Sequence, residues 1–188
     1  MRLYFIRHGQ SELNLKGILA GQTDTPLTDE GREQAKEAAV KLEGIKFDAV
    51  FSSDLSRAHE TQKIMLPDYT AVTTPLVREF DMVELVGNTM DEIIKRYGEH
   101  TIKQAFNTHD FKQFGGESKE DVKIRLKQFL SDVIDKDYEN VAVFCHSGLC
   151  KTMLTLAAGC DWMNSYCDNC SVNVFEYTDK YRLVKWNY

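Results

Sequence analysis

The chain has 188 residues, of which 43% are hydrophobic, so it can bury the core of one domain without a metal ion or disulfide to support it. Its 29 Asp and Glu residues outnumber its 23 Lys and Arg residues, which gives a formal net charge of −6. This balance argues against nucleic acid and against an anionic membrane surface as partners, because both attract Lys and Arg. A small anionic ligand in a local cationic pocket remains compatible with it.

Membrane insertion and export are not indicated by the sequence. No stretch approaches the roughly 20 apolar residues of a membrane span, and the apolar run at 3–6 is too short for a signal peptide. The odd number of cysteines, five, then indicates reduced thiols. Cys167 and Cys170 form a Cys-x-x-Cys pair with Cys160 nearby, but no fourth zinc ligand is evident. We expect a cytoplasmic protein without a metal site, as a monomer or homodimer.

The first predicted elements are a strand and a helix. Residues 3–6 form a short continuous apolar run, which is typical of a strand buried on both faces. Thr28, followed by two acidic residues, predicts the N-cap of a helix. Apolar residues at helical spacing over 35–42 define its buried face, and Gly44 ends it.

A second strand and a less regular region follow. Residues 49–51 read as a strand, and Asp54 resembles the cap of a helix that starts near Leu55. Residues 67–117 contain two prolines and several glycines. We interpret about 75–117 as a helical insertion that covers a site.

The last third of the chain predicts two helices, a strand and a hairpin. Ser118 and Asp121 resemble a capping box that opens a long amphipathic helix. Residues 141–145 form a third buried strand, and a helix over about 148–158 follows it. Residues 172–186 look like a closing hairpin. The alternation of strands and helices favours a single α/β domain over 1–188, with a mostly parallel sheet.

Each of the three buried strands leads directly into polar residues. Arg7 and His8 follow the first strand, residues 52–54 and then Arg57 follow the second, and His146 follows the third. In open α/β sheets, ligands bind beyond the carboxyl ends of the strands. Two arginines and two histidines would therefore converge at one edge. Guanidinium groups bind phosphate through paired hydrogen bonds, and an imidazole can attack phosphorus, so this set predicts a phosphoryl site.

Other phosphoryl-transfer and hydrolytic chemistries lack their residues. A cysteine phosphatase needs Cys-x5-Arg, but Lys151 stands six residues after Cys145 and Leu156 six residues after Cys150. No Asp-x-Asp pair follows a predicted strand. The chain also has no phosphate-binding Gly-x-x-x-x-Gly-Lys loop, no Gly-x-Gly-x-x-Gly and no His-Glu-x-x-His. Histidine chemistry remains.

The sequence of residues 3–11 resembles the signature of the histidine phosphatase superfamily, the phosphoglycerate mutase-like proteins. Further similar segments follow in the order of that family over about residues 1–160. They are Asn14, residues 24–28 with Gly31, residues 52–58, Arg78-Glu79, Gly116-Glu117-Ser118 and His146-Ser147-Gly148. An isolated Arg-His-Gly would be weak evidence, whereas the ordered set is specific.

The resemblance implies a three-layer sandwich with helices on both faces of the sheet, and a mechanism without metal ion or organic cofactor. His8 would attack phosphorus and become a phosphohistidine, with its other ring nitrogen donating a hydrogen bond. Glu79 would protonate the leaving group and then help to activate water. The resemblance also implies a set of residues that bind phosphate or substrate: Arg7, Asn14, Gln22, Arg57, His146 and Ser147. Of these, Arg7, Arg57 and His146 would also stabilise the developing charge.

Within this family we favour a phosphatase that acts on small phosphorylated metabolites, similar to the broad-specificity and α-ribazole-phosphate phosphatases. Cofactor-dependent phosphoglycerate mutases are longer and hold the substrate carboxylate with added basic residues, whereas the stretch 80–117 is short and rich in acids. Mutase activity is the alternative, and a catalytically silent phospho-ligand binder is a third possibility. Two departures leave the substrate open: Ala20 stands where a polar residue is expected, and Val83-Glu84-Leu85-Val86-Gly87 differs from the phosphatase branch.

Overall fold

A computed structural model of the chain describes residues 1–159 and 165–188, with a six-stranded sheet at its centre. The strand order is β3-β2-β4-β1-β5-β6. Strands β1 to β4 run parallel to one another, and β5 is antiparallel both to β1 and to β6. The strands are β1 Arg2–Arg7, β2 Ala49–Ser53, β3 Val72–Thr74, β4 Asn140–Cys145, β5 Val172–Tyr177 and β6 Tyr181–Lys185. The predicted mostly parallel α/β sheet is confirmed.

The apolar runs form strands because both faces of the sheet are covered. Along β1, Leu3 and Phe5 belong to the core on one face, while Tyr4 and Ile6 belong to the core on the other. Side chains alternate between the two faces of a strand, so a strand buried on both faces needs a continuous apolar run. The same alternation holds along β4.

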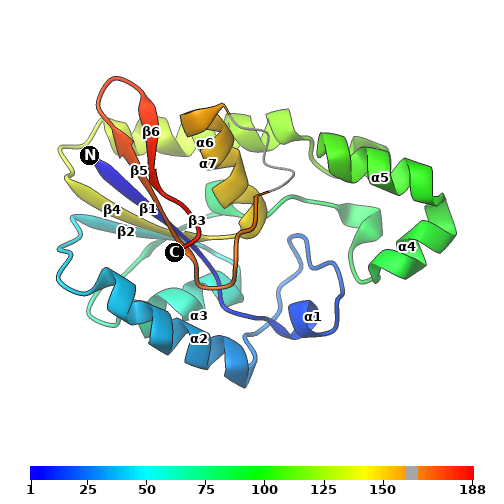
Figure 1. Cartoon of the computed structure of the whole chain (residues 1–188), viewed down its shortest axis with the longest axis horizontal. Coiled ribbons are helices and arrows are strands. Elements are labelled where there is room, and N and C mark those ends of the chain that lie inside the picture. Colours follow the sequence, from blue (N-terminus) through cyan, green and yellow to red (C-terminus); the bar gives the residue numbers. More distant parts are fainter. Residues whose placement is uncertain (160–164) are drawn as a thin grey trace.

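Helices cover both faces of the sheet, which confirms the three-layer arrangement (Figure 1). Helices α2 (Asp29–Ala39) and α3 (Ser56–Met65) pack on one face. Helices α6 (Lys119–Ile134) and α7 (Ser147–Ala158) pack on the other. In Figure 1 the first pair lies below the sheet and the second pair above it. A single turn of helix, α1 (Glu12–Leu15), follows β1.

Two of the predicted helix caps are confirmed and one is wrong. The Thr28 side chain accepts a hydrogen bond from the Gly31 N–H, and Ser118 and Asp121 form the capping box of α6. Helix α3 instead has Leu55 at its N-cap, with no side-chain cap. Asp54 does not cap it, because both of its carboxylate oxygens bind the guanidinium of Arg78, at 2.7 and 2.6 Å.

The region over 67–117 contains one strand that the sequence did not indicate. Strand β3 is only three residues long, lies at the edge of the sheet and ends beside Pro75. Because it is so short and largely exposed, it has no apolar run that would mark it in the sequence. The helices here are α4 (Met90–Tyr97) and α5 (Glu99–Thr108), which lie beyond the carboxyl ends of the parallel strands (Figure 1). Short 3-10 turns occur at Val40–Leu42, Pro75–Val77, Val83–Leu85 and Lys112–Phe114. That this region covers the active site stays a prediction.

Neither a membrane-spanning helix nor a metal cluster is found in the part of the chain that the structure describes. No helix there is long and apolar enough to cross a membrane. No group of three or more His, Cys, Asp or Glu side chains among those residues could hold a metal ion. Cys167 and Cys170 are buried and unpaired, as expected of small apolar residues beside a strand, and Cys160 lies outside the described residues.

Candidate active site

The register of the sheet brings the two candidate histidines together. Arg7 lies opposite Cys145 in the parallel pair β1–β4, so the residues that follow, His8 and His146, leave the sheet side by side. Their ring centroids are 5.1 Å apart, and the residues are 4% and 0% exposed. The site therefore begins at the carboxyl edge of the sheet.

His8 is held as a neutral imidazole whose Nε2 carries no proton. Its Nδ1 lies 2.7 Å from the Gly9 carbonyl oxygen, which can only accept, so Nδ1 carries the proton. Nε2 accepts a hydrogen bond from Arg57 Nε at 3.2 Å. Burial, and next the positive charges of Arg57 and Arg7, hold the pKa of His8 well below its ordinary value. The ring therefore keeps the lone pair that nucleophilic attack requires.

Arg57 is fixed beside this lone pair by the loop that precedes α2. The side chain is 1% exposed, and its two terminal nitrogens donate to the carbonyl oxygens of Thr23 and Gly21, both at 2.9 Å. Burial lowers the pKa of Arg57, although a guanidinium group stays charged in proteins. Its position in the first turn of α3, where a cation is unfavourable, fits a site built for an anion.

Arg7 and His146 each have a buried ring or guanidinium nitrogen that finds no partner among the residues described. Three buried atoms have no hydrogen-bond partner within the described residues. They are the two ring nitrogens of His146 and the Nε of Arg7. Arg7 Nη1 donates to the Cys167 carbonyl oxygen, which orients the guanidinium. Burial, and then the charge of Arg57, lower the pKa of His146 well below its ordinary value, so its imidazole is neutral and donates one N–H. A tetrahedral anion would give these donors their acceptor.

Glu79 reaches the same edge from the segment after β3. Its Oε2 accepts a hydrogen bond from the Gly148 N–H at the start of α7 (3.1 Å), and its Oε1 accepts one from the Phe80 N–H (3.0 Å). A Cβ at Gly148 would lie 2.2 Å from Glu79 Oε1, so only glycine permits this approach. The side chain of Glu79 is thereby bound at Gly148, which follows His146 by two positions in the sequence.

The three remaining candidates differ in what their side chains do. Asn14 Oδ1 accepts a hydrogen bond from the Ser11 N–H at 3.2 Å. This contact holds the side chain in place, and its Nδ2 is the group that could donate to a ligand. Ser147, together with Arg7, lines a cavity of about 460 Å³. Gln22 Nε2 donates to the Glu79 carbonyl oxygen at 3.1 Å, and its Oε1 accepts from Arg78 at 3.3 Å. Gln22 thus supports the segment that carries Glu79, and its contact with substrate stays a prediction.

Sequence reasoning missed the residues that hold the backbone around His8. Asn169 Nδ2 donates to the His8 carbonyl oxygen at 2.9 Å. Thr61, one turn after Arg57 on α3, accepts a hydrogen bond from the Gly9 N–H at 3.0 Å. Thr61 lies in no recognisable motif, and Asn169 is a variable position inside the Cys167-x-x-Cys170 pair. Each reaches this backbone through one hydrogen bond across a long sequence separation, so no local pattern signals the contact.

A pair of glycines lets the loop after β1 touch α2 directly. A Cβ at Gly9 would lie 2.4 Å from the Gly31 carbonyl oxygen, and one at Gly31 would lie 2.1 Å from the Gln10 carbonyl oxygen. Gly31 belongs to the segments that resemble the family, and this close backbone approach explains why a glycine is needed at that position.

The chemistry that the site supports follows from these parts. A neutral imidazole lone pair, two guanidinium groups and a second neutral imidazole lie together at the sheet edge, close enough for both arginines to lower the pKa of both histidines. Fixed donors of this kind stabilise charge that develops on the oxygens of a transferring phosphoryl group. The site therefore suits the transfer of a phosphoryl group to His8.

Comparison with known proteins agrees with this chemistry. The family described as "Histidine phosphatase superfamily (branch 1)" matches residues 3–188. A phosphoglycerate mutase described as 2,3-bisphosphoglycerate-dependent, from Gloeobacter violaceus, is 31% identical over 160 residues, 81% of this chain and 73% of the relative. One of the same description from Mesorhizobium japonicum is 37% identical over 131 residues, 66% of this chain and 64% of the relative.

Solved structures resemble the chain over nearly its whole length. The Bacillus stearothermophilus protein YhfR has a TM-score of 0.88 at 26% identity, covering 97% of this chain and 95% of its own. A mycobacterial glucosyl-3-phosphoglycerate phosphatase in complex with VO3 has a TM-score of 0.86 at 26% identity, covering 99% and 98%. A putative α-ribazole-5'-P phosphatase from Escherichia coli, at 24% identity and a TM-score of 0.85 over 100% and 97% of the two chains, has the same fold. The chain belongs to the histidine phosphatase superfamily, as an enzyme of the phosphatase and mutase type.

Proposed function

We propose that the protein is a metal-independent phosphomonoester hydrolase that acts on small phosphorylated metabolites through a phosphohistidine on His8. The observation that carries the proposal is the neutral, buried His8, whose Nε2 lone pair lies 3.2 Å from Arg57 Nε. A bound phosphoryl group would take over the Arg57 N–H and lie directly in front of the nucleophile.

In the first step, the Nε2 lone pair of His8 forms a bond to phosphorus while the bond to the ester oxygen breaks. The leaving alkoxide takes a proton from the carboxyl group of Glu79. Arg7, Arg57 and His146 donate hydrogen bonds to the non-bridging oxygens, where negative charge accumulates. The Gly9 carbonyl oxygen, which accepts the Nδ1 proton, stabilises the positive charge that His8 acquires.

In the second step, water attacks phosphorus and the P–N bond breaks. The Glu79 carboxylate, left deprotonated by the first step, takes the proton from that water. His8 recovers its lone pair, and inorganic phosphate leaves. The two steps return every group to its starting state, so the cycle consumes only ester and water.

Hydrolysis is favoured over mutase activity by the local partners of three of the four Lys and Arg residues between residues 80 and 117. A mutase must hold the rest of its substrate while the phosphoryl group moves between hydroxyls. Lys103 pairs with Glu99 at 2.6 Å, Lys112 pairs with Asp121 at 3.1 Å, and the Arg96 guanidinium lies 5.0 Å from the centre of the Tyr97 ring. These cations already have local partners. The names of the sequence relatives support the mutase alternative, and the phosphatase structural neighbours support hydrolysis.

Trapping of the phosphoenzyme tests the proposal. Wild-type protein mixed with a labelled phosphomonoester and quenched rapidly is expected to carry acid-labile label, and to release phosphate from p-nitrophenyl phosphate in the presence of a chelator. His8→Ala should lose both, whereas His100→Ala, at an exposed position on α5, should retain them. Label retained by His8→Ala, or activity abolished by the chelator, would contradict the mechanism.

A second assay separates the three functions within the family. With 3-phosphoglycerate and 2,3-bisphosphoglycerate, phosphate release should exceed formation of 2-phosphoglycerate. The reverse ratio would establish the mutase, and vanadate binding without any turnover would indicate a silent binder. A cytoplasmic location, and a monomer or homodimer as the assembled state, stay predictions.

A further inference from the structure

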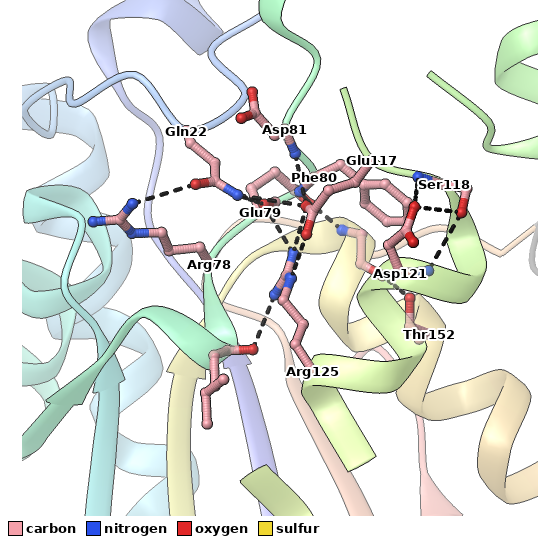
Figure 2. Close-up of polar contacts among 12 residues, drawn as sticks. Gln22, Arg78, Glu79, Phe80, Asp81, Glu117, Ser118, Asp121, Arg125 and Thr152 are labelled. Carbon is pink, nitrogen blue, oxygen red and sulfur yellow. Dashed lines mark hydrogen bonds and ion pairs between the residues drawn. The ribbon is translucent and has the colours of Figure 1, made fainter. Parts of the chain in front are cut away.

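The segment Gly116-Glu117-Ser118 has no part in the two chemical steps, yet it lies against the residues around Glu79 (Figure 2). The Glu117 N–H donates to the Asp81 carbonyl oxygen at 2.9 Å. A Cβ at Gly116 would lie 2.2 Å from that same oxygen, so the two backbones meet where only glycine fits. Ser118 begins the capping box of α6. This junction links the start of α6 to the segment that carries Glu79.

The Glu117 carboxylate continues the contact from its side chain. Its Oε2 accepts a hydrogen bond from the Asp81 N–H at 2.9 Å, so Asp81 is bound through both its N–H and its carbonyl oxygen. Arg125, two turns along α6, donates to both oxygens of the same carboxylate, from Nε at 2.9 Å and from Nη2 at 3.1 Å. The side chains are 13% exposed for Arg125 and 22% exposed for Glu117, so water screens this pair little.

Arg125 also binds the backbone on the other side of Glu79. Its Nη1 donates to the Leu76 carbonyl oxygen at 2.9 Å, and its Nη2 donates to the Glu79 carbonyl oxygen at 3.0 Å. Gln22 Nε2 donates to the same Glu79 oxygen and to Glu117 Oε2. Figure 2 shows these side chains converging on the short segment from Glu79 to Asp81.

We propose that Glu117 and Arg125 are positioning residues that fix the backbone of residues 79–81 so that the Glu79 carboxyl group meets the leaving-group oxygen. The proposal rests on the proposed function of Glu79 as the general acid. The chain after β3 is short of regular structure here, and a small displacement of a catalytic group costs a large factor in rate. A planar guanidinium with five N–H groups can bind two carbonyl oxygens and a carboxylate at once, whereas a lysine ammonium cannot keep this geometry.

The test uses the dependence of turnover on the leaving group, because a poor leaving group needs the general acid and a good one does not. Wild type, Glu79→Gln, Glu117→Gln and Arg125→Lys are compared on an alkyl phosphate and on p-nitrophenyl phosphate. All three variants should lose at least about 10-fold more kcat/KM on the alkyl ester, since kcat/KM reports the step in which the leaving group departs and general acid catalysis typically contributes about 100-fold or more. Arg32→Lys, which changes a surface ion pair with Glu60, should keep the wild-type ratio.

Non-additivity provides the second readout. If Arg125 acts through Glu79, then Glu79→Gln/Arg125→Lys should show no more leaving-group selectivity than Glu79→Gln alone. Gly116→Ala displaces the Asp81 carbonyl without removing a charge, and should give the same selective loss even if Arg125→Lys does not fold. Equal losses on both esters in folded Glu117→Gln and Gly116→Ala would overturn the positioning role while the function stands. Absence of phosphate release and phosphoenzyme in the wild type would instead refute the proposed function and this inference with it.

Discussion

At the scale of single residues, the protonation state of His8 decides whether the site can work. The residue is surrounded by groups that oppose a positive charge: a low-dielectric interior and the guanidinium groups of Arg57 and Arg7. The Gly9 carbonyl oxygen, which favours the charged ring, acts against them with the smallest effect. The same cations that would bind the phosphoryl group therefore keep the nucleophile neutral before it binds.

A titration of the free protein tests this arrangement. The ring nitrogens of His8, followed by NMR in 15N-histidine-labelled protein, should show a neutral imidazole at pH values well below the ordinary pKa of about 6.5. Arg57→Met removes the second-largest cause of the shift, so the pKa of His8 should rise in that variant without recovering fully, because burial remains. Protonation of wild-type His8 at or above its ordinary pKa would contradict the prediction.

At the scale of elements, the start of α7 joins the acid to the second histidine. Helix α7 has no acidic residue in its first turn, and the Gly148 N–H at its start instead binds the side chain of Glu79. Gly148 makes this possible, since its N–H donates to Oε2 and its missing Cβ leaves room for Oε1.

Gly148→Ala should therefore displace the Glu79 carboxylate while the helix itself persists, because alanine favours helix more than glycine does. The expected result is a loss of kcat/KM that is greater on alkyl phosphates than on p-nitrophenyl phosphate, together with some loss of stability, because the added Cβ would also lie 2.6 Å from Cδ2 of the buried Phe80 ring. Ala157→Gly, in the last turn of the same helix, is the control: it should lower stability by up to about 1 kcal/mol and leave the ratio of rates unchanged. If Gly148→Ala kept the wild-type ratio of the rates on the two esters, the contact between Gly148 and Glu79 would not be needed to position the acid.

The elements differ in how well the sequence predicts them. Strands β1, β2 and β4 were predictable because two-sided burial leaves a continuous apolar run, and α2 and α6 because their caps are local. Strand β3 was not, since a short edge strand needs no such run. Asp54 was misassigned because a cap and an ion-pair partner can look alike in sequence, and the partner, Arg78, lies 24 residues away.

At the scale of the whole molecule, the candidate residues that follow strand ends were brought together by the sheet, because parallel strands place their carboxyl ends along one edge. The contacts around Glu79 and His8 could not be foreseen in this way. Arg125 resembles an ordinary helix residue in sequence, and its acceptors at Leu76 and Glu79 become neighbours only when α6 packs beside the segment after β3.

The net charge of −6 also has a different meaning in the folded molecule. Arg57, His8 and His146 are almost fully buried at one edge of the sheet, while most ion pairs of the acidic residues lie at the surface.

Burial of two neutral histidines beside cations makes the stability of the fold depend on pH, because protons then bind the unfolded chain more readily than the native one.

The direction of that dependence is fixed by the lowered pKa values. Between the ordinary pKa of about 6.5 and the lower native values, the unfolded state binds more protons, so the free energy of unfolding falls as pH falls. Each histidine contributes a slope of at most about 1.4 kcal/mol per pH unit. Urea unfolding between about pH 6.5 and 5, above the range where most carboxylates titrate, should show this slope in wild type and a shallower one in His8→Asn/His146→Asn. Equal slopes in the two proteins would mean that the buried histidines do not couple protonation to folding.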